Sequence, residues 1–145
     1  MSVQMFRALA VTATLNVIGV SGAVLFARQT PESVFTTEQA TAGRAAYAKH
    51  CASCHMPDLS GNTEIPPLAG EVFLGTWGGR STKDLFDYSA EAMPYGAPSL
   101  SPENYTAITA YILQANGGVA GSTALTGSTA VPIRSVIARQ KPPSP

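Results

Sequence analysis

The stretch AKHCASCHMP, residues 48–57, constrains this 145-residue chain more than any other part of its sequence. It holds both cysteines and both histidines of the chain, with Cys51, Cys54 and His55 in a C-x-x-C-H arrangement. Two thiols and an imidazole at this spacing can form a redox dithiol, part of a zinc site, or the attachment point of a covalent haem. Each of these sites needs a different fold around it, so the surrounding sequence can separate them.

The redox dithiol and the zinc site fit the surrounding sequence poorly. A redox dithiol belongs in a βαβ setting, whereas a helical pattern precedes this motif and no strand is visible. Structural zinc needs four ligands in a tetrahedron, and here all four would come from residues 50–55, with His50 as the fourth. The C-x-x-C-H spacing instead lets both thiols add to haem vinyl groups while His55 reaches the iron. We therefore expect one covalent haem c.

Three segments have the sequence pattern of helices, at residues 36–51, 81–89 and 101–118. Each begins with a serine or threonine that can cap a helix, and the first two continue with a Gln or Asp that can complete a capping box. The third has proline at its first helical position and ends in Asn-Gly-Gly. No stretch alternates as a strand does. We predict an all-α fold, in which three to four helices wrap around one covalent haem.

The two ends of the chain differ from its middle. Residues 1–28 have a basic start, an apolar run and small residues, which is the layout of a signal peptide or an N-terminal anchor. Residues 36–118 form the predicted folded domain, and residues 119–145 predict a flexible, low-complexity tail. We expect a periplasmic or other extracytoplasmic location, because haem of this kind is attached outside the cytoplasm. The membrane is a partner only if the leader stays uncleaved.

The net charge of zero hides an acidic body. Residues 32–118 carry four basic and nine acidic side chains, a net charge of −5, and both ends of the chain are basic. Binding to nucleic acid needs a basic face, so we expect no nucleic-acid partner. An acidic body suits a redox protein partner that presents a basic patch.

A haem bound by His55 can take a second axial ligand on the opposite face of its iron. His50 and Met56 lie too close to His55 to cross to that face, and two of the other methionines belong to the leader. Met93, in the loop EAMPYGAP, is the remaining candidate. His/Met ligation raises the reduction potential and closes the iron to substrates, so we expect an electron-transfer protein and no enzyme. A haem enzyme or sensor with an open sixth site is the alternative.

Further residues are candidates for contacts around the haem. A ligating imidazole usually donates its second N–H to an oxygen, and the carbonyl of Pro66 or Pro67 is well placed in the sequence to accept it from His55. Trp77 and Arg80 can hydrogen-bond a haem propionate through the indole N–H and the guanidinium group. These residues complete the expected cofactor site.

With these motifs placed, residues 36–118 resemble the class I monohaem cytochromes c. The resemblance rests on CASCH, PPLAG, the methionine loop and a last helix that carries tyrosines. It implies that the first and last helices cross, with a contact formed by Gly43 and Tyr47 against Tyr105, Ile108 and Ile112. The segment from MPYGAP to ILQANG is similar to cytochrome subunits associated with quinoprotein alcohol dehydrogenases. That similarity implies a dehydrogenase as electron donor and an oxidase or another cytochrome as acceptor.

Overall fold

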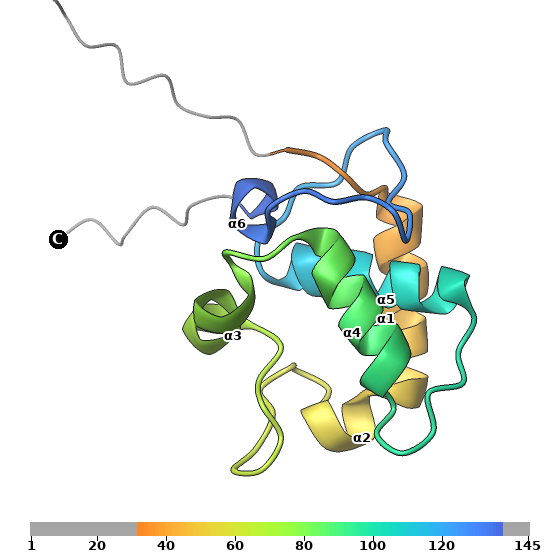
Figure 1. Ribbon diagram of the computed structural model, residues 1–145, viewed down its shortest axis with the longest axis vertical. Coiled ribbons are helices and arrows are strands. Elements are labelled where there is room, and N and C mark those ends of the chain that lie inside the picture. Colours follow the sequence, from red (N-terminus) through yellow and green to blue (C-terminus); the bar gives the residue numbers. More distant parts are fainter. Residues whose placement is uncertain (1–31, 138–145) are drawn as a thin grey trace, which may run out of the picture.

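The computed structural model describes residues 32–137, which fold into helices (Figure 1). The helices are α1 (Thr37–His50), α2 (Ala52–His55), α3 (Gly70–Trp77), α4 (Thr82–Ala92), α5 (Pro102–Ala115) and α6 (Ile133–Val136). Extended pairing in this part of the chain is limited to two isolated bridges. The predicted all-α fold is confirmed. The predicted number of helices was too low, because α2 and α6 are single turns and α3 lacks a capping side chain.

Local sequence signals fix the starts of α1, α4 and α5. Both predicted capping boxes are present, formed by Thr36 with Gln39 and by Ser81 with Asp84. At the start of α5, the hydroxyl of Ser101 accepts a hydrogen bond from a backbone amide in the first turn. The first amides of a helix have no partner inside it, and each such cap contributes about 1 kcal/mol by satisfying one.

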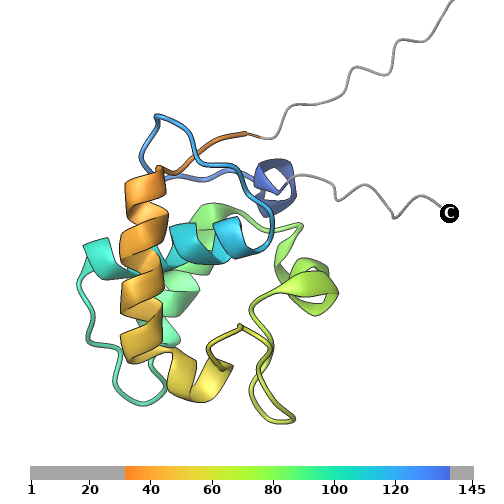
Figure 2. The same cartoon turned by 180° about the vertical axis from the view of Figure 1, so that it is seen from behind.

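Helices α1 and α5 cross and form the most extensive helix pair of the fold (Figure 2). A Cβ atom built on Gly43 would lie 1.8 Å from the carbonyl oxygen of Ala107, so a glycine is required at this point of α1. One turn later, the rings of Tyr47 and Tyr111 pack with their centroids 5.3 Å apart. The crossing therefore depends on one missing side chain and one aromatic pair.

The crossing of the first and last helices, which the resemblance implied, has Ala107 and Tyr111 of α5 at its closest point. The nearest atoms to Gly43 belong to Ala107 and Tyr111. The three expected residues instead line a cavity; they are Tyr105, Ile108 and Ile112. Ala107 and Tyr111 are four positions apart and face α1, and the neighbouring stripe of Tyr105, Ile108 and Ile112 faces the cavity.

Residues 119–137 pack back onto the domain, and we call them the C-terminal strap (Figures 1 and 2). The sequence predicted a flexible tail from residue 119, and the structure corrects that prediction for the strap. Four of its large apolar side chains take buried positions in the core, at Leu125, Ile133, Val136 and Ile137. Leu125 stands alone, and Ile133, Val136 and Ile137 form only one short helical pattern, so the Gly, Ser, Thr and Ala around them suggested disorder. The predicted leader, residues 1–28, and the end of the predicted tail lie outside the described residues.

Hydrogen bonds fasten the strap to the domain at several places, of which two lie beside functional elements. The side chain of Gln39 donates to the carbonyl of Leu125 and accepts from its amide, both at 2.8 Å. Further along, the amide of Ile133 donates to the carbonyl of Arg80 at 2.9 Å. The strap therefore secures both the start of α1 and the turn between α3 and α4. None of the helices within residues 32–137 has the length and apolarity that crossing a membrane requires.

Candidate functional site

A cavity of about 550 Å³ lies among α2, α3, α4 and α5. Ligand pockets in proteins range from roughly 300 to 1,000 Å³, so the cavity has room for a bulky group. Much of its wall is apolar and includes Leu68, Phe73, Leu85, Ile108 and Ile112. The cavity brings together every predicted site residue: Cys51, Cys54, His55, Pro67, Trp77, Arg80 and Met93.

His55 ends the single turn of α2 and is buried, with 8% of its surface exposed. Its Nδ1 atom lies 3.0 Å from the carbonyl oxygen of Pro66. A carbonyl can only accept, so we assign the proton to Nδ1, which leaves Nε2 as the nitrogen with a free lone pair. Of the two carbonyls that the sequence offered, Pro66 makes this contact, and Pro67 contributes only to the cavity wall.

The backbone around His55 is held by the buried Tyr47, whose hydrogen bonds here sequence reasoning missed. The hydroxyl of Tyr47 donates to the carbonyl of Met56 at 2.7 Å and lies 3.2 Å from that of His55. Burial raises the pKa of Tyr47 well above its usual value, so the hydroxyl remains a donor. Met56 has φ 64° and ψ 151°, a combination that L-residues rarely adopt and that costs about 1–3 kcal/mol. The bond from Tyr47 helps to hold this strained backbone in place.

The two cysteines flank the cavity and are positioned as in a C-x-x-C-H motif. Cys51 is half-buried and Cys54 is exposed. Burial, with a smaller effect from Cys54, raises the pKa of the Cys51 thiol to about 11. A structural zinc site needs four Cys or His ligands around one point. Within residues 32–137, no three His, Cys, Asp or Glu side chains converge in this way.

Met93 reaches the cavity from the end of α4, where its backbone is extended, with φ −126° and ψ 141°. The proline that follows favours this conformation. The amide of Met93 donates to the carbonyl of Ser89 at 3.0 Å, and its carbonyl accepts a hydrogen bond of 2.5 Å from the hydroxyl of Tyr105. The sequence predicted the extended backbone but not the contact with Tyr105, because the partner comes from another helix.

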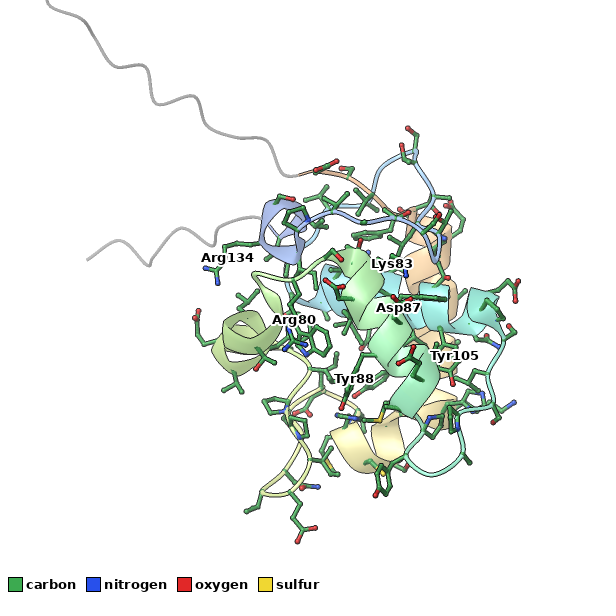
Figure 3. All side chains as sticks on the ribbon, viewed as in Figure 1. Arg80, Lys83, Asp87, Tyr88, Tyr105 and Arg134 are labelled. Atoms are coloured by element: carbon green, nitrogen blue, oxygen red, sulfur yellow. The ribbon has the colours of Figure 1, made fainter. Side chains whose placement is uncertain are left out.

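Trp77, Arg80 and Tyr88 lie together in the wall of the cavity. Arg80 and Tyr88 are labelled in Figure 3. The guanidinium carbon of Arg80 lies 4.8 Å from the centre of the Trp77 ring. The ring of Tyr88 also packs on Trp77, with the two ring centroids 5.4 Å apart. Arg80 is thereby held at the cavity by a cation–π contact. Sequence reasoning missed Tyr88, whose position on α4 gave no signal of this aromatic partner.

These residues fit a covalent haem. The motif supplies two thiols and an imidazole from one short turn, and the imidazole already has the carbonyl partner that an iron-bound histidine needs. The apolar wall suits a porphyrin ring, and Arg80 supplies a positive charge for its acidic groups. The donor atoms and the size and lining of the cavity are therefore all consistent with a covalent haem.

The comparison with known families gives the same result. The model of a family described as cytochrome C oxidase, cbb3-type, subunit III matches residues 38–112, just over half of the chain. No curated protein and no solved structure matches the chain. Cytochrome c domains exchange electrons with redox protein partners and typically lie outside the cytoplasm. The chain therefore belongs to this family of c-type cytochromes, and its cofactor is a covalently bound haem c.

Proposed function

We propose that this protein is an exported electron carrier in which His55 and Met93 bind the two faces of the haem iron. One observation carries the proposal: the two residues predicted as axial ligands, one at the end of α2 and one directly after α4, line the same cavity as the two cysteines. The haem, when bound, supplies reversible one-electron oxidation and reduction. The protein attaches the ring through Cys51 and Cys54 and restricts access to the iron.

The surrounding residues orient the ligands and the ring. Pro66 fixes the orientation of the His55 ring through its carbonyl, which also raises the basicity of the imidazole. Pro67 adds apolar wall to the cavity. Trp77 and Arg80 provide hydrogen-bond donors for the propionates, of which the Arg80 guanidinium is the charged one.

Electron exchange with partners would take place on the exposed surface beside the cysteines. Cys54 and Pro57 are exposed there, and the acidic side chains of Asp58 and Glu64 are exposed on the segment that follows α2. Such a surface favours a partner that presents a basic patch, because opposite charges steer encounter. The leader at residues 1–28 supports export, as a cleaved signal or as an anchor.

The sixth ligand can be tested by the spectrum of the oxidised protein. Methionine sulfur gives ferric haem a far-red absorbance band, so we expect this band in the wild-type protein and its loss in Met93→Ala. Met56→Leu is the matched control, because it removes a sulfur beside His55, and we expect it to keep the band. A wild-type protein without the band, or a Met93→Ala variant that retains it, would refute Met93 as ligand and favour a haem enzyme or sensor with an open site.

A second candidate is the cytochrome subunit of a quinoprotein dehydrogenase complex. The similarity of the methionine loop and α5 to such subunits supports it. Purification from the native periplasm separates the two: a stably bound quinoprotein supports the subunit, and a monomer that exchanges electrons with several acceptors supports the free carrier.

A further inference from the structure

We propose that the hydroxyl of Tyr105 is a positioning group that keeps the Met93 loop, residues 93–100, closed over the cavity. This inference rests on the proposed binding of the iron by Met93. It assigns to Tyr105 the control of how readily an external ligand can replace that methionine. Tyr105 itself does not bind the iron and acts only through the loop.

The hydroxyl of Tyr105 connects both ends of the loop. It donates to the carbonyl oxygen of Met93 at 2.5 Å and accepts from the amide of Leu100 at 3.4 Å. Tyr105 lies in the first turn of α5 (Figure 3), and its side chain lines the cavity. Only 5% of its surface is exposed. A buried oxygen on a rigid helix thus joins two points of the chain that lie seven residues apart.

The rest of the loop has little else to hold it. Residues 95–99 are all exposed, and Tyr95 is 93% exposed. The amide of Ala97 donates to the carbonyl of Pro94, which is a bond inside the loop. Among the described residues, the hydrogen bonds that join this loop to α5 are therefore the two made by Tyr105.

An exposed loop with few tertiary contacts opens locally, at a much lower free energy than the whole fold. Tyr105→Phe removes the oxygen but keeps the ring that lines the cavity. The free carbonyl of Met93 and the free amide of Leu100 can then reach water when the loop opens. We expect the ratio of open to closed loop to rise about tenfold, as the loss of hydrogen bonds of ordinary strength predicts.

The test measures the replacement of Met93 by imidazole in the oxidised, full-length holoprotein, followed through the far-red band. We expect Tyr105→Phe to keep the band in the absence of imidazole and to lose it about ten times faster than wild type when imidazole is added. Tyr111→Phe is the matched control: it lies on the same helix, and its hydroxyl makes no hydrogen bond within the described residues. We expect it to exchange as wild type does.

The outcomes separate the two proposals. If the band is absent from wild type or survives in Met93→Ala, Met93 is not the ligand and the proposed function fails. If the band depends on Met93 but Tyr105→Phe exchanges at the wild-type rate, the proposed function stands and the role of Tyr105 is refuted. The same refutation follows if Tyr111→Phe accelerates exchange as much as Tyr105→Phe does.

A second measurement does not depend on the iron ligands or on the folding of a variant. In the native holoprotein, we expect the amide of Leu100 to exchange with deuterium at least about ten times more slowly than the exposed amide of Ser99, after correction for their intrinsic rates. Equal protection of the two amides would show that the bond from Leu100 to Tyr105 does not hold the loop, and would overturn the proposal.

Discussion

The His55 side and the Met93 side of the cavity are supported in different ways. The ring of His55 is oriented by the carbonyl of Pro66, and the backbone carbonyl of His55 accepts a hydrogen bond from the hydroxyl of Tyr47. Apart from the last turn of α4, the hydrogen bond that holds Met93 within the described residues comes from Tyr105. A side with several independent bonds opens only with the fold around it, whereas a side with one anchor can open locally.

The segments that follow the two proposed ligands show the same contrast. In residues 56–69, the side-chain oxygen of Asn62 accepts from two backbone amides, at 2.9 and 3.0 Å. The end of this segment is fastened to α5, because the side chain of Asn116 donates to the carbonyl of Leu68 and accepts from the amide of Gly70. The Met93 loop has no comparable network among the described residues. We therefore expect changes on the His55 side to lower the stability of the fold, and changes on the Met93 side to alter the rate of ligand exchange.

The largest effect is expected on the His55 side, from Asn116→Ala. Asn116 is buried, and its side chain makes three hydrogen bonds, to Leu68, Gly70 and Ile112. Its truncation removes three hydrogen bonds, one of them buried and two part-buried, so we expect the free energy of unfolding to fall by about 3 kcal/mol. Urea unfolding of the holoprotein measures this loss.

Two results would contradict that prediction. Gln114→Ala, an exposed change on the same helix, should alter stability by less than about 0.5 kcal/mol, and an equal loss in both variants would show a general weakness of α5. If Asn116→Ala instead left stability unchanged but accelerated the exchange with imidazole, the two sides would not be independent.

Sequence reasoning succeeded where the signal is local. The C-x-x-C-H motif, the capping boxes and the extended backbone before Pro94 are each set by residues close in sequence, so they could be predicted. Helix α3 was missed because Ala69 provides no side-chain cap and Gly70 begins it with a φ of 82°. Its start is fixed from a distance, through the bond between Gly70 and Asn116.

The parts that the sequence did not reveal depend on which faces meet in the fold. Tyr105 and Tyr111 look alike in the sequence, yet one faces the cavity and the other packs against α1. The choice depends on the packing of Gly43 against Ala107, which only the assembled helices show. In the strap, Ile133 and Val136 are fully buried although the composition around them is that of a disordered segment.

A smaller effect is expected from Tyr47→Phe, the counterpart of the change at Tyr105. The carbonyls of His55 and Met56 keep their backbone partners but lose the buried hydroxyl as a second one, so we expect the free energy of unfolding to fall by about 1–2 kcal/mol. The rate at which imidazole replaces Met93 should stay at the wild-type value. Measured side by side, Tyr47→Phe should change stability and Tyr105→Phe should change exchange. Faster exchange in Tyr47→Phe, with lower stability in Tyr105→Phe, would contradict the proposed difference between the two sides.

The smallest effect concerns the start of α4, the helix that ends at Met93. Asp84 accepts hydrogen bonds from the amide and the hydroxyl of Ser81, and these bonds lower the pKa of its carboxyl below the usual value. A carboxyl with a lowered pKa stabilises the folded state while it is ionised, and this contribution disappears as the pH falls through the lowered pKa. The difference in stability between wild type and Asp84→Ala should therefore shrink in acid, as urea unfolding at neutral and acidic pH would show. Because Tyr105 holds the other end of α4, the exchange of Met93 should not change in Asp84→Ala. Faster exchange in this variant would mean that the Met93 side depends on the whole of α4, and that Tyr105 is not its main anchor.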